Sequence, residues 1–160
     1  MVSPMYPILE SLVCFSAASK RELPALRLRS SNPLAYLKEH CTIRCSCARQ
    51  SGHSFAVRHA AQRLFHRTLV LTPTFSIARR FLEVTKGFDS TLLTNDRLVC
   101  CSLHEATVSQ SVSYVGFDAI VVDPSYGMTA GKIDDVYSIA LANLLGSDDE
   151  ALDVSVVFMG

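Results

Sequence analysis

An apolar run that ends in an acid, Ala119–Val122 followed by Asp123, is the stretch of the chain best suited to chemistry. A short apolar run with a carboxylate at its end is typical of a buried parallel strand with the acid at its carboxyl tip. Open α/β sheets bind ligands beyond the carboxyl ends of their strands, and an acid placed there can hold the water shell of Mg²⁺. The following residues are rich in Pro, Ser and Gly and predict a loop, then an amphipathic helix over 132–145.

A second stretch, from Cys47 to Ser54, has the length of a phosphate-binding loop. In the pattern G-x-x-x-x-G-K-[S/T], backbone N–H groups hold phosphate, the lysine spans two phosphates and the hydroxyl reaches Mg²⁺. The matching residues here are Cys47, Gly52, His53 and Ser54. Gly52 and Ser54 keep the pattern. Cys47 lacks the freedom in φ that glycine gives a tight turn, and a neutral imidazole at His53 does not supply the permanent charge of lysine.

Strands that alternate with helices surround these two stretches. We predict strands over 42–47, 68–72, 98–101, 119–122 and 154–159. We predict helices over 54–66, from a Thr74 cap to Gly87, and over 132–145, with a short helix or loop at 103–112. This alternation predicts an α/β fold with a mostly parallel sheet and helices on both faces. Residues 1–40 contain four prolines and are expected to be an irregular extension with short helices at 8–18 and 34–39, ahead of a domain at 41–160.

Charge and composition narrow the class of protein. Residues 1–80 carry 12 Lys and Arg against 3 acids, whereas residues 81–160 carry 3 against 12, so net charges of +9 and −9 cancel. The basic half either forms a face for nucleic acid or is neutralised by the acidic half within the fold. No apolar run reaches the roughly 18–20 residues of a membrane helix. Six irregularly spaced cysteines are typical of reduced thiols and favour a cytoplasmic location.

The order of these motifs resembles a known family. The loop at 47–54 is followed by TLVLTPTFSIARRF, then FDAIVVDPSYG, then VVFMG. Together they resemble the first RecA-like domain of superfamily 1 helicases of positive-strand RNA viruses, which include replicase helicases and helicase-like movement proteins. The resemblance covers about residues 42–160. It implies a P-loop NTPase half-domain that is incomplete at its carboxyl end, because the family's later strand ends in Gly-Asp and this chain stops at Gly160.

The resemblance also implies a set of site residues. It implies that Gly52, His53 and Ser54 bind nucleotide and that Asp123 and Ser54 bind the metal ion. Contact with single-stranded nucleic acid falls to Thr72, Pro73 and Thr74. The family's glutamate that polarises the attacking water is replaced by Pro124, so we assign no catalytic residue and expect impaired hydrolysis.

The function that follows is a viral helicase-like domain that binds single-stranded RNA, with weak binding of Mg²⁺ and ATP or GTP. It would act in replication or movement in the cytoplasm of an infected cell, with other viral or host proteins as further partners. One alternative is a non-enzymatic interaction module, a movement or host-defence factor that keeps the fold as a scaffold. Another is a segment of an active NTPase or helicase, so whether the chain is an enzyme stays open at this stage.

Overall fold

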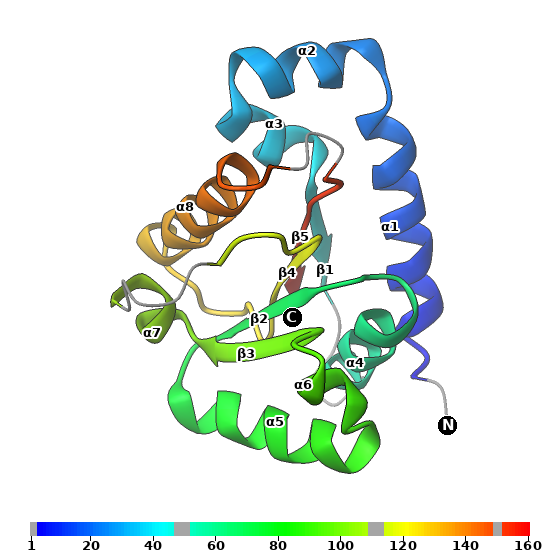
Figure 1. The fold of residues 1–160 in the computed structure, drawn as a ribbon, viewed down its shortest axis with the longest axis vertical. Helices are drawn as coiled ribbons and strands as arrows, with labels where there is room; N and C mark the ends of the chain where they lie inside the picture. Colours follow the sequence, from blue (N-terminus) through cyan, green and yellow to red (C-terminus); the bar gives the residue numbers. More distant parts are fainter. Residues whose placement is uncertain (1–2, 47–51, 109–113, 149–151) are drawn as a thin grey trace.

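A computed structural model describes residues 3–46, 52–108, 114–148 and 152–160, which form one parallel sheet flanked by helices (Figure 1). The strands are β1 Thr42–Cys45, β2 Thr68–Thr72, β3 Leu98–Ser102, β4 Ala119–Val122 and β5 Ser155–Met159. The helices are α1 Tyr6–Lys20, α2 Leu23–Ser31, α3 Pro33–His40, α4 His53–Arg63, α5 Phe75–Phe88, α6 Thr91–Thr94, α7 Leu103–Val108 and α8 Ala130–Leu145. The predicted α/β fold is confirmed and is consistent with a RecA-like or Rossmann-type arrangement.

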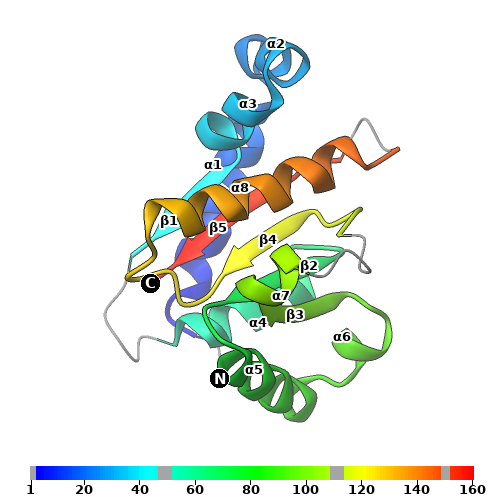
Figure 2. The same ribbon diagram turned by 90° about the vertical axis from the view of Figure 1, so that its left-hand side faces the viewer.

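The strand order β1-β5-β4-β2-β3 fixes where the chain changes direction. From β1 the chain crosses by α4 to β2 and continues by α5 to β3. It then turns back, reaching β4 through α7 and β5 through α8. Crossovers between parallel strands are right-handed, so the helices of the outward path lie on one face and those of the return path on the other. Figure 2 shows α8 along one face, with α1 behind the sheet.

Alternating strand residues build two cores. Leu71, Ile120 and Val156 face a cluster that includes residues of α3, α7 and α8. Their neighbours Val70, Val121 and Val157 face the other cluster, which includes residues of α1, α4 and α5. All residues of β2, β4 and β5 are buried. A parallel sheet covered on both faces gives continuous apolar runs, which is why these strands could be found in the sequence.

The N-terminal segment is more regular than the predicted irregular extension with short helices at 8–18 and 34–39. Helices α1 and α3 overlap those two ranges, and α2 was not predicted. Residues 6–40 form three consecutive helices, and their prolines lie at helix starts. Pro33 is the first residue of α3, while Pro7 and Pro24 are the second residues of α1 and α2. Proline has no N–H to donate, and at a helix start that donor would have no helical partner, so proline is tolerated there. These prolines therefore mark where helices begin.

Several predicted boundaries also change. Gly87 does not end α5, which continues to Phe88, and the N–H of Asp89 bonds to the carbonyl of Thr85. The predicted cap at Thr74 is confirmed, since its side chain accepts a hydrogen bond from the N–H of Ile77. Helix α8 begins two residues before the predicted start, because the side chain of Thr129 caps it. The predicted helix at 54–66 runs from His53 to Arg63.

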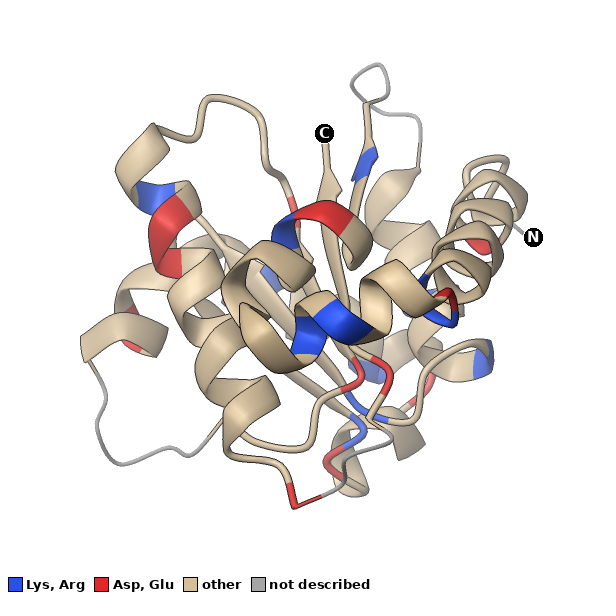
Figure 3. Ribbon diagram, turned by 90° about the horizontal axis from the view of Figure 1, so that it is seen from above, with Lys and Arg blue, Asp and Glu red and all other residues tan. Residues whose placement is uncertain are grey.

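Opposite charges from the two halves of the chain meet in the fold. Three ion pairs join a residue of the first half to an acid of the second: Lys20–Asp153, Lys38–Asp134 and His53–Asp123. In Figure 3 both charge colours occur across the whole view and do not separate onto two sides. Among the described residues, no helix is both long and apolar enough to cross a membrane.

Lys20 fastens the N-terminal helices to the sheet. Its side chain is 5% exposed and its ammonium donates to the carbonyl of Val154 at 3.0 Å and to Oγ of Ser155 at 3.3 Å. It also forms an ion pair with Asp153, whose side chain is half exposed. A buried ammonium needs such partners, since an unpaired charge is costly to remove from water. The contact joins the end of α1 to the start of β5.

Replacing Lys20 with Met should destabilise the protein. The apolar stem is kept, but the Val154 carbonyl and the Ser155 hydroxyl lose their donor, for which we expect a loss of about 1–3 kcal/mol in the free energy of unfolding. Urea unfolding of the two proteins gives the difference. Lys38→Met is the control, because its pair with Asp134 is exposed and spans 4.0 Å. Equal urea midpoints for the Lys20 variant and the unmodified protein would contradict this role.

Candidate functional site

The candidate site lies at the carboxyl edge of the sheet, beside the neighbouring strands β2 and β4, whose following helices α5 and α8 cover opposite faces. The loop after β4, the first turns of α4 and one side of α5 surround an open cavity of about 630 Å³. We call it the α4–α5 cavity, and the described residues that line it are His53, Ser54, Arg58, Ser76, Ile77, Arg80, Phe81, Val84, Asp123, Pro124 and Tyr126. Crevices beside two neighbouring strands whose following helices cover opposite faces are the usual ligand sites of open α/β sheets.

His53 and Asp123 are in direct contact within this cavity. Nδ1 of His53 lies 2.5 Å from Oδ1 of Asp123, and the two side chains are 18% and 1% exposed. The hydrogen bond to Asp123 raises the pKa of the imidazole, although burial of the ring acts in the opposite direction. The carboxylate thus favours the charged ring. Seventy residues apart in sequence, two predicted site residues are brought together.

The turn before α4 has a backbone conformation that favours glycine. Gly52 caps α4 with φ of +79°, a region that side chains other than glycine rarely adopt. Oγ of Ser3 donates to the Gly52 carbonyl at 2.8 Å, so the N-terminal segment holds this turn in place. Ser54 lines the same cavity as His53 and Asp123. Cys47, the first position of the predicted phosphate loop, lies outside the described residues.

The second oxygen of Asp123 lacks a hydrogen-bond partner within the described part of the chain. Oδ2 is buried and accepts no hydrogen bond from any described residue. Leaving a buried acceptor without a donor costs about 1–3 kcal/mol, so such an oxygen favours a donor in the adjoining cavity. Such a group at a cavity wall is typical of a functional site.

Two arginines of the cavity were missed by the sequence analysis. Arg58 is 5% exposed, donates from Nε to Oγ1 of Thr85 at 3.0 Å and lies over the ring of Phe81 at 4.6 Å. Burial lowers its pKa, while the charge of Asp123 acts against that change. Arg80 lines the cavity from the exposed side of α5. Their spacing in the sequence could have identified them. Arg58 comes four residues after Ser54, and Arg80 comes four residues after Ser76, so each pair lies on one helix face.

Apolar and aromatic side chains complete the wall. Ile77, Phe81 and Val84 recur at helical spacing along α5, and Ile77 and Val84 stay partly exposed to solvent. Tyr126, on the loop after β4, is 56% exposed. A groove that alternates cations with apolar and aromatic surface suits ligands that combine phosphate with flat rings.

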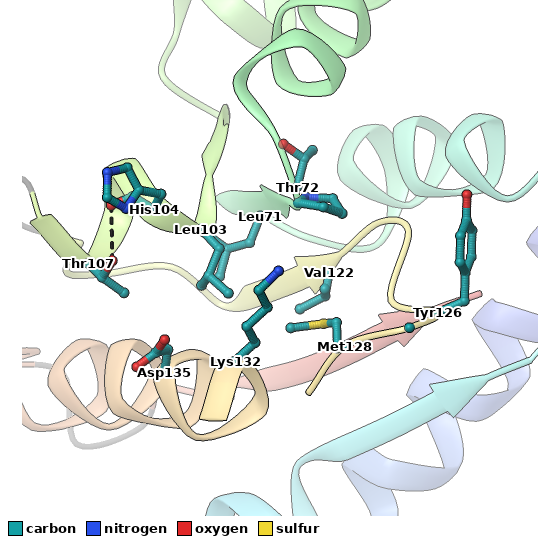
Figure 4. A pocket seen from close by; sticks show the side chains of 12 residues that line it. Leu71, Thr72, Leu103, His104, Thr107, Val122, Tyr126, Met128, Lys132 and Asp135 are labelled. Carbon is teal, nitrogen blue, oxygen red and sulfur yellow. Dashed lines mark hydrogen bonds between the residues drawn. The ribbon is translucent and has the colours of Figure 1, made fainter. Parts of the chain in front are cut away.

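Thr72, Pro73 and Thr74, which were predicted to contact nucleic acid, do not line the α4–α5 cavity. Thr72 is buried, and its hydroxyl donates to the Thr74 carbonyl at 2.9 Å. The Thr74 hydroxyl caps α5. Thr72 and Pro73 line another cavity, on the opposite face of the sheet (Figure 4). Both hydroxyls therefore serve the local backbone, and the structure separates Thr72 and Pro73 from the pair of His53 and Asp123.

The donor set at Asp123 does not fit Mg²⁺ bound by the protein alone. Mg²⁺ takes six oxygen ligands, commonly one or two carboxylates together with water and substrate phosphates. Asp123 is the one carboxylate among the described residues lining this cavity, and His53 occupies one of its oxygens. Within the described part of the chain there is no cluster of three His, Cys, Asp or Glu able to hold a metal. Ser54 adds a single hydroxyl near this acid.

Comparison of the sequence with protein-family models and with curated proteins finds no match. The function is therefore inferred from the residues of the site. They are the buried charges of Arg58 and Asp123, the half-buried imidazole of His53 and the exposed Arg80.

Replacing His53 with Gln should remove a pH-dependent part of the stability. Because the folded-state pKa of His53 is raised, the contribution of its charged ring is complete below the ordinary pKa of 6.5 and is lost as pH rises through the higher folded value. The free energy of unfolding of the unmodified protein should exceed that of the variant by the largest amount near about pH 6. This difference should become smaller toward about pH 9.

Urea unfolding at intervals of pH measures this difference. His66→Gln, at an exposed ring, is the matched control and should show no comparable trend. A difference in stability between His53→Gln and the unmodified protein that stays constant over the whole range would mean that folding does not raise the pKa of His53.

Proposed function

We propose that this chain is a helicase-like domain that binds single-stranded RNA through the α4–α5 cavity, with impaired NTP hydrolysis, in viral replication or movement. The observation that carries the proposal is the convergence of His53, Arg58 and Arg80 on one cavity at the carboxyl edge of the sheet. Weak binding of Mg²⁺ with ATP or GTP stays a prediction from the sequence.

The charges of the cavity favour a phosphate. Arg58 and Arg80 carry permanent charge, the raised pKa of His53 adds a fraction of another, and Asp123 is the one acid among the described lining residues. Arginine binds phosphate through paired N–H groups. His53 is also the first residue of α4, whose N-terminal N–H groups favour an anion. An RNA backbone offers the matching ligand.

The apolar wall favours a single RNA strand as the ligand rather than a free phosphate ion. Ile77, Val84 and Tyr126 each leave more than a third of their surface exposed beside the cationic side chains. Unpaired bases stack on such surfaces with little preference for sequence. Phosphate contacts position the strand, and the apolar wall provides room for its bases.

The same cavity is poorly equipped for hydrolysis. His53 stands where a phosphate loop has lysine, and its ring is held by Asp123. Pro124 follows Asp123 where the resembled family has a glutamate, so no neighbouring carboxylate can orient an attacking water. Binding without turnover is the function that these residues support.

Replacing Arg80 with Ala should weaken binding of a fluorescently labelled single-stranded RNA by about fivefold to tenfold, through loss of one charge-assisted phosphate contact. For the unmodified protein, three neutralised phosphates predict a slope of about −2 for log affinity against log salt, or a loss of roughly fifteenfold between about 50 and 200 mM salt. Fluorescence anisotropy measures both quantities.

Arg79→Ala is the matched control, because Arg79 is the preceding residue on α5, is exposed and bonds to Glu83 at 3.1 Å outside the cavity. Arg79→Ala should change RNA affinity by less than twofold, because an exposed ion pair contributes little free energy. Equal losses in the two variants would show that binding follows overall charge, and absence of binding to the unmodified protein would end the proposal.

Phosphate release from ATP or GTP should stay near background, with or without RNA. A missing charge clamp and a missing oriented base would each lower turnover by roughly 10²–10³-fold. A phosphate-release assay with Mg²⁺ tests this expectation. Robust turnover that disappears in Asp123→Ala would establish an active NTPase and overturn it.

A further inference from the structure

A second cavity lies on the opposite face of the sheet, between α7 and α8. It encloses about 230 Å³ beyond the carboxyl ends of β2 and β4 (Figure 4). We call it the α7–α8 cavity. Ligand sites for drug-sized molecules occupy about 300–1,000 Å³, so an occupant of this cavity is small. The cavity is separate from the α4–α5 cavity, although Tyr126 borders both.

Two side chains of opposite charge, Lys132 and Asp135, lie at the rim of this cavity. Lys132 and Asp135 lie three residues apart on α8, a spacing at which side chains can pair. Nevertheless, they do not pair with each other, and within the described residues neither side chain forms a hydrogen bond or an ion pair. In Figure 4 both side chains rise from α8 into the space below β2 and α7. Lys132 also lies in the first turn of α8, where the helix dipole disfavours a cation and a bound anion would offset that cost.

One wall of the cavity is apolar, and the polar side chains of Thr72, His104 and Thr107 also line it. Its floor is made by Leu71, Leu103, Val122 and Met128, which extend from β2, α7, β4 and the loop before α8. Leu71, Leu103 and Val122 are buried, and Met128 packs against the same core. Methionine adapts its shape to an apolar ligand. One cation, one anion and an apolar floor therefore meet within a small volume.

We propose that the α7–α8 cavity binds a free α-amino acid with an apolar side chain. The ligand's carboxylate pairs with Lys132, its ammonium group pairs with Asp135, and its side chain lies against Leu103 and Met128. This class uses both rim charges and the floor together, whereas a fatty acid leaves Asp135 facing an anion and an amine leaves Lys132 facing a cation. The site is independent of RNA binding at the α4–α5 cavity.

Four related probes test the three contacts. Leucine carries all three groups, N-acetyl-leucine lacks the ammonium, leucinamide lacks the carboxylate and glycine lacks the side chain. Titration into the isotope-labelled protein, followed by amide NMR, should give shifts confined to α7, α8 and the ends of β2 and β4. Leucine should bind in the millimolar range, and each of the other probes should bind about twofold to fivefold more weakly, as expected for an exposed ion pair or a small apolar contact.

Variants assign each contact to its residue. Lys132→Met should bring leucine down to the affinity of leucinamide, and Asp135→Asn should remove the difference between leucine and N-acetyl-leucine. Asp134→Asn is the matched control, because Asp134 faces Lys38 and does not line the cavity. Equal affinity for all four probes, no binding of leucine, or an equal effect of Asp134→Asn and Asp135→Asn would overturn the proposal. RNA affinity should be the same in all three variants.

Discussion

A parallel sheet must be covered on both faces, and this requirement governs the architecture of the chain. Strand β1 is an edge strand, and α4, which follows it, crosses to a distant part of the sheet. The cover near β1 comes from residues ahead of it, because α1 contributes Tyr6 and Leu9 to one core and α3 contributes Tyr36 and Leu37 to the other. The N-terminal helices are thus an integral part of the domain, and Lys20 and Ser3 connect them to β5 and to the turn at Gly52.

Much of the fold could be predicted because burial on two faces leaves a strong mark in sequence. The predicted bounds of β2 and β4 are those observed, and both are continuous apolar runs bounded by threonine, proline or acid. In the N-terminal segment, short helices were predicted where α1 and α3 lie, but α2 was missed and the segment was expected to be irregular. A proline can either break a helix or begin one, and composition does not distinguish the two. That distinction depends on where the preceding turn packs.

The candidate site was predictable only in part, for a similar reason. His53, Ser54 and Asp123 lie in the segments that follow β1 and β4, and topology brings them to one cavity. Arg58 and Arg80 reach it from the sides of two helices whose relative placement is a tertiary property. The hydroxyls of Thr72 and Thr74 show the opposite case, since a motif in sequence does not reveal that the local backbone already uses both groups.

The position of β5 has a consequence for how the protein is made. This strand lies between β1 and β4 in the sheet, although it is the last of the five in sequence. While the chain emerges from the ribosome, β2, β3 and β4 can pair with one another, but β1 has no neighbour until residue 159 has been synthesised. The nascent chain thus carries two unpaired strand edges, which invite pairing with other chains. Completion of the sheet must wait for β5, which joins β1 to the other strands.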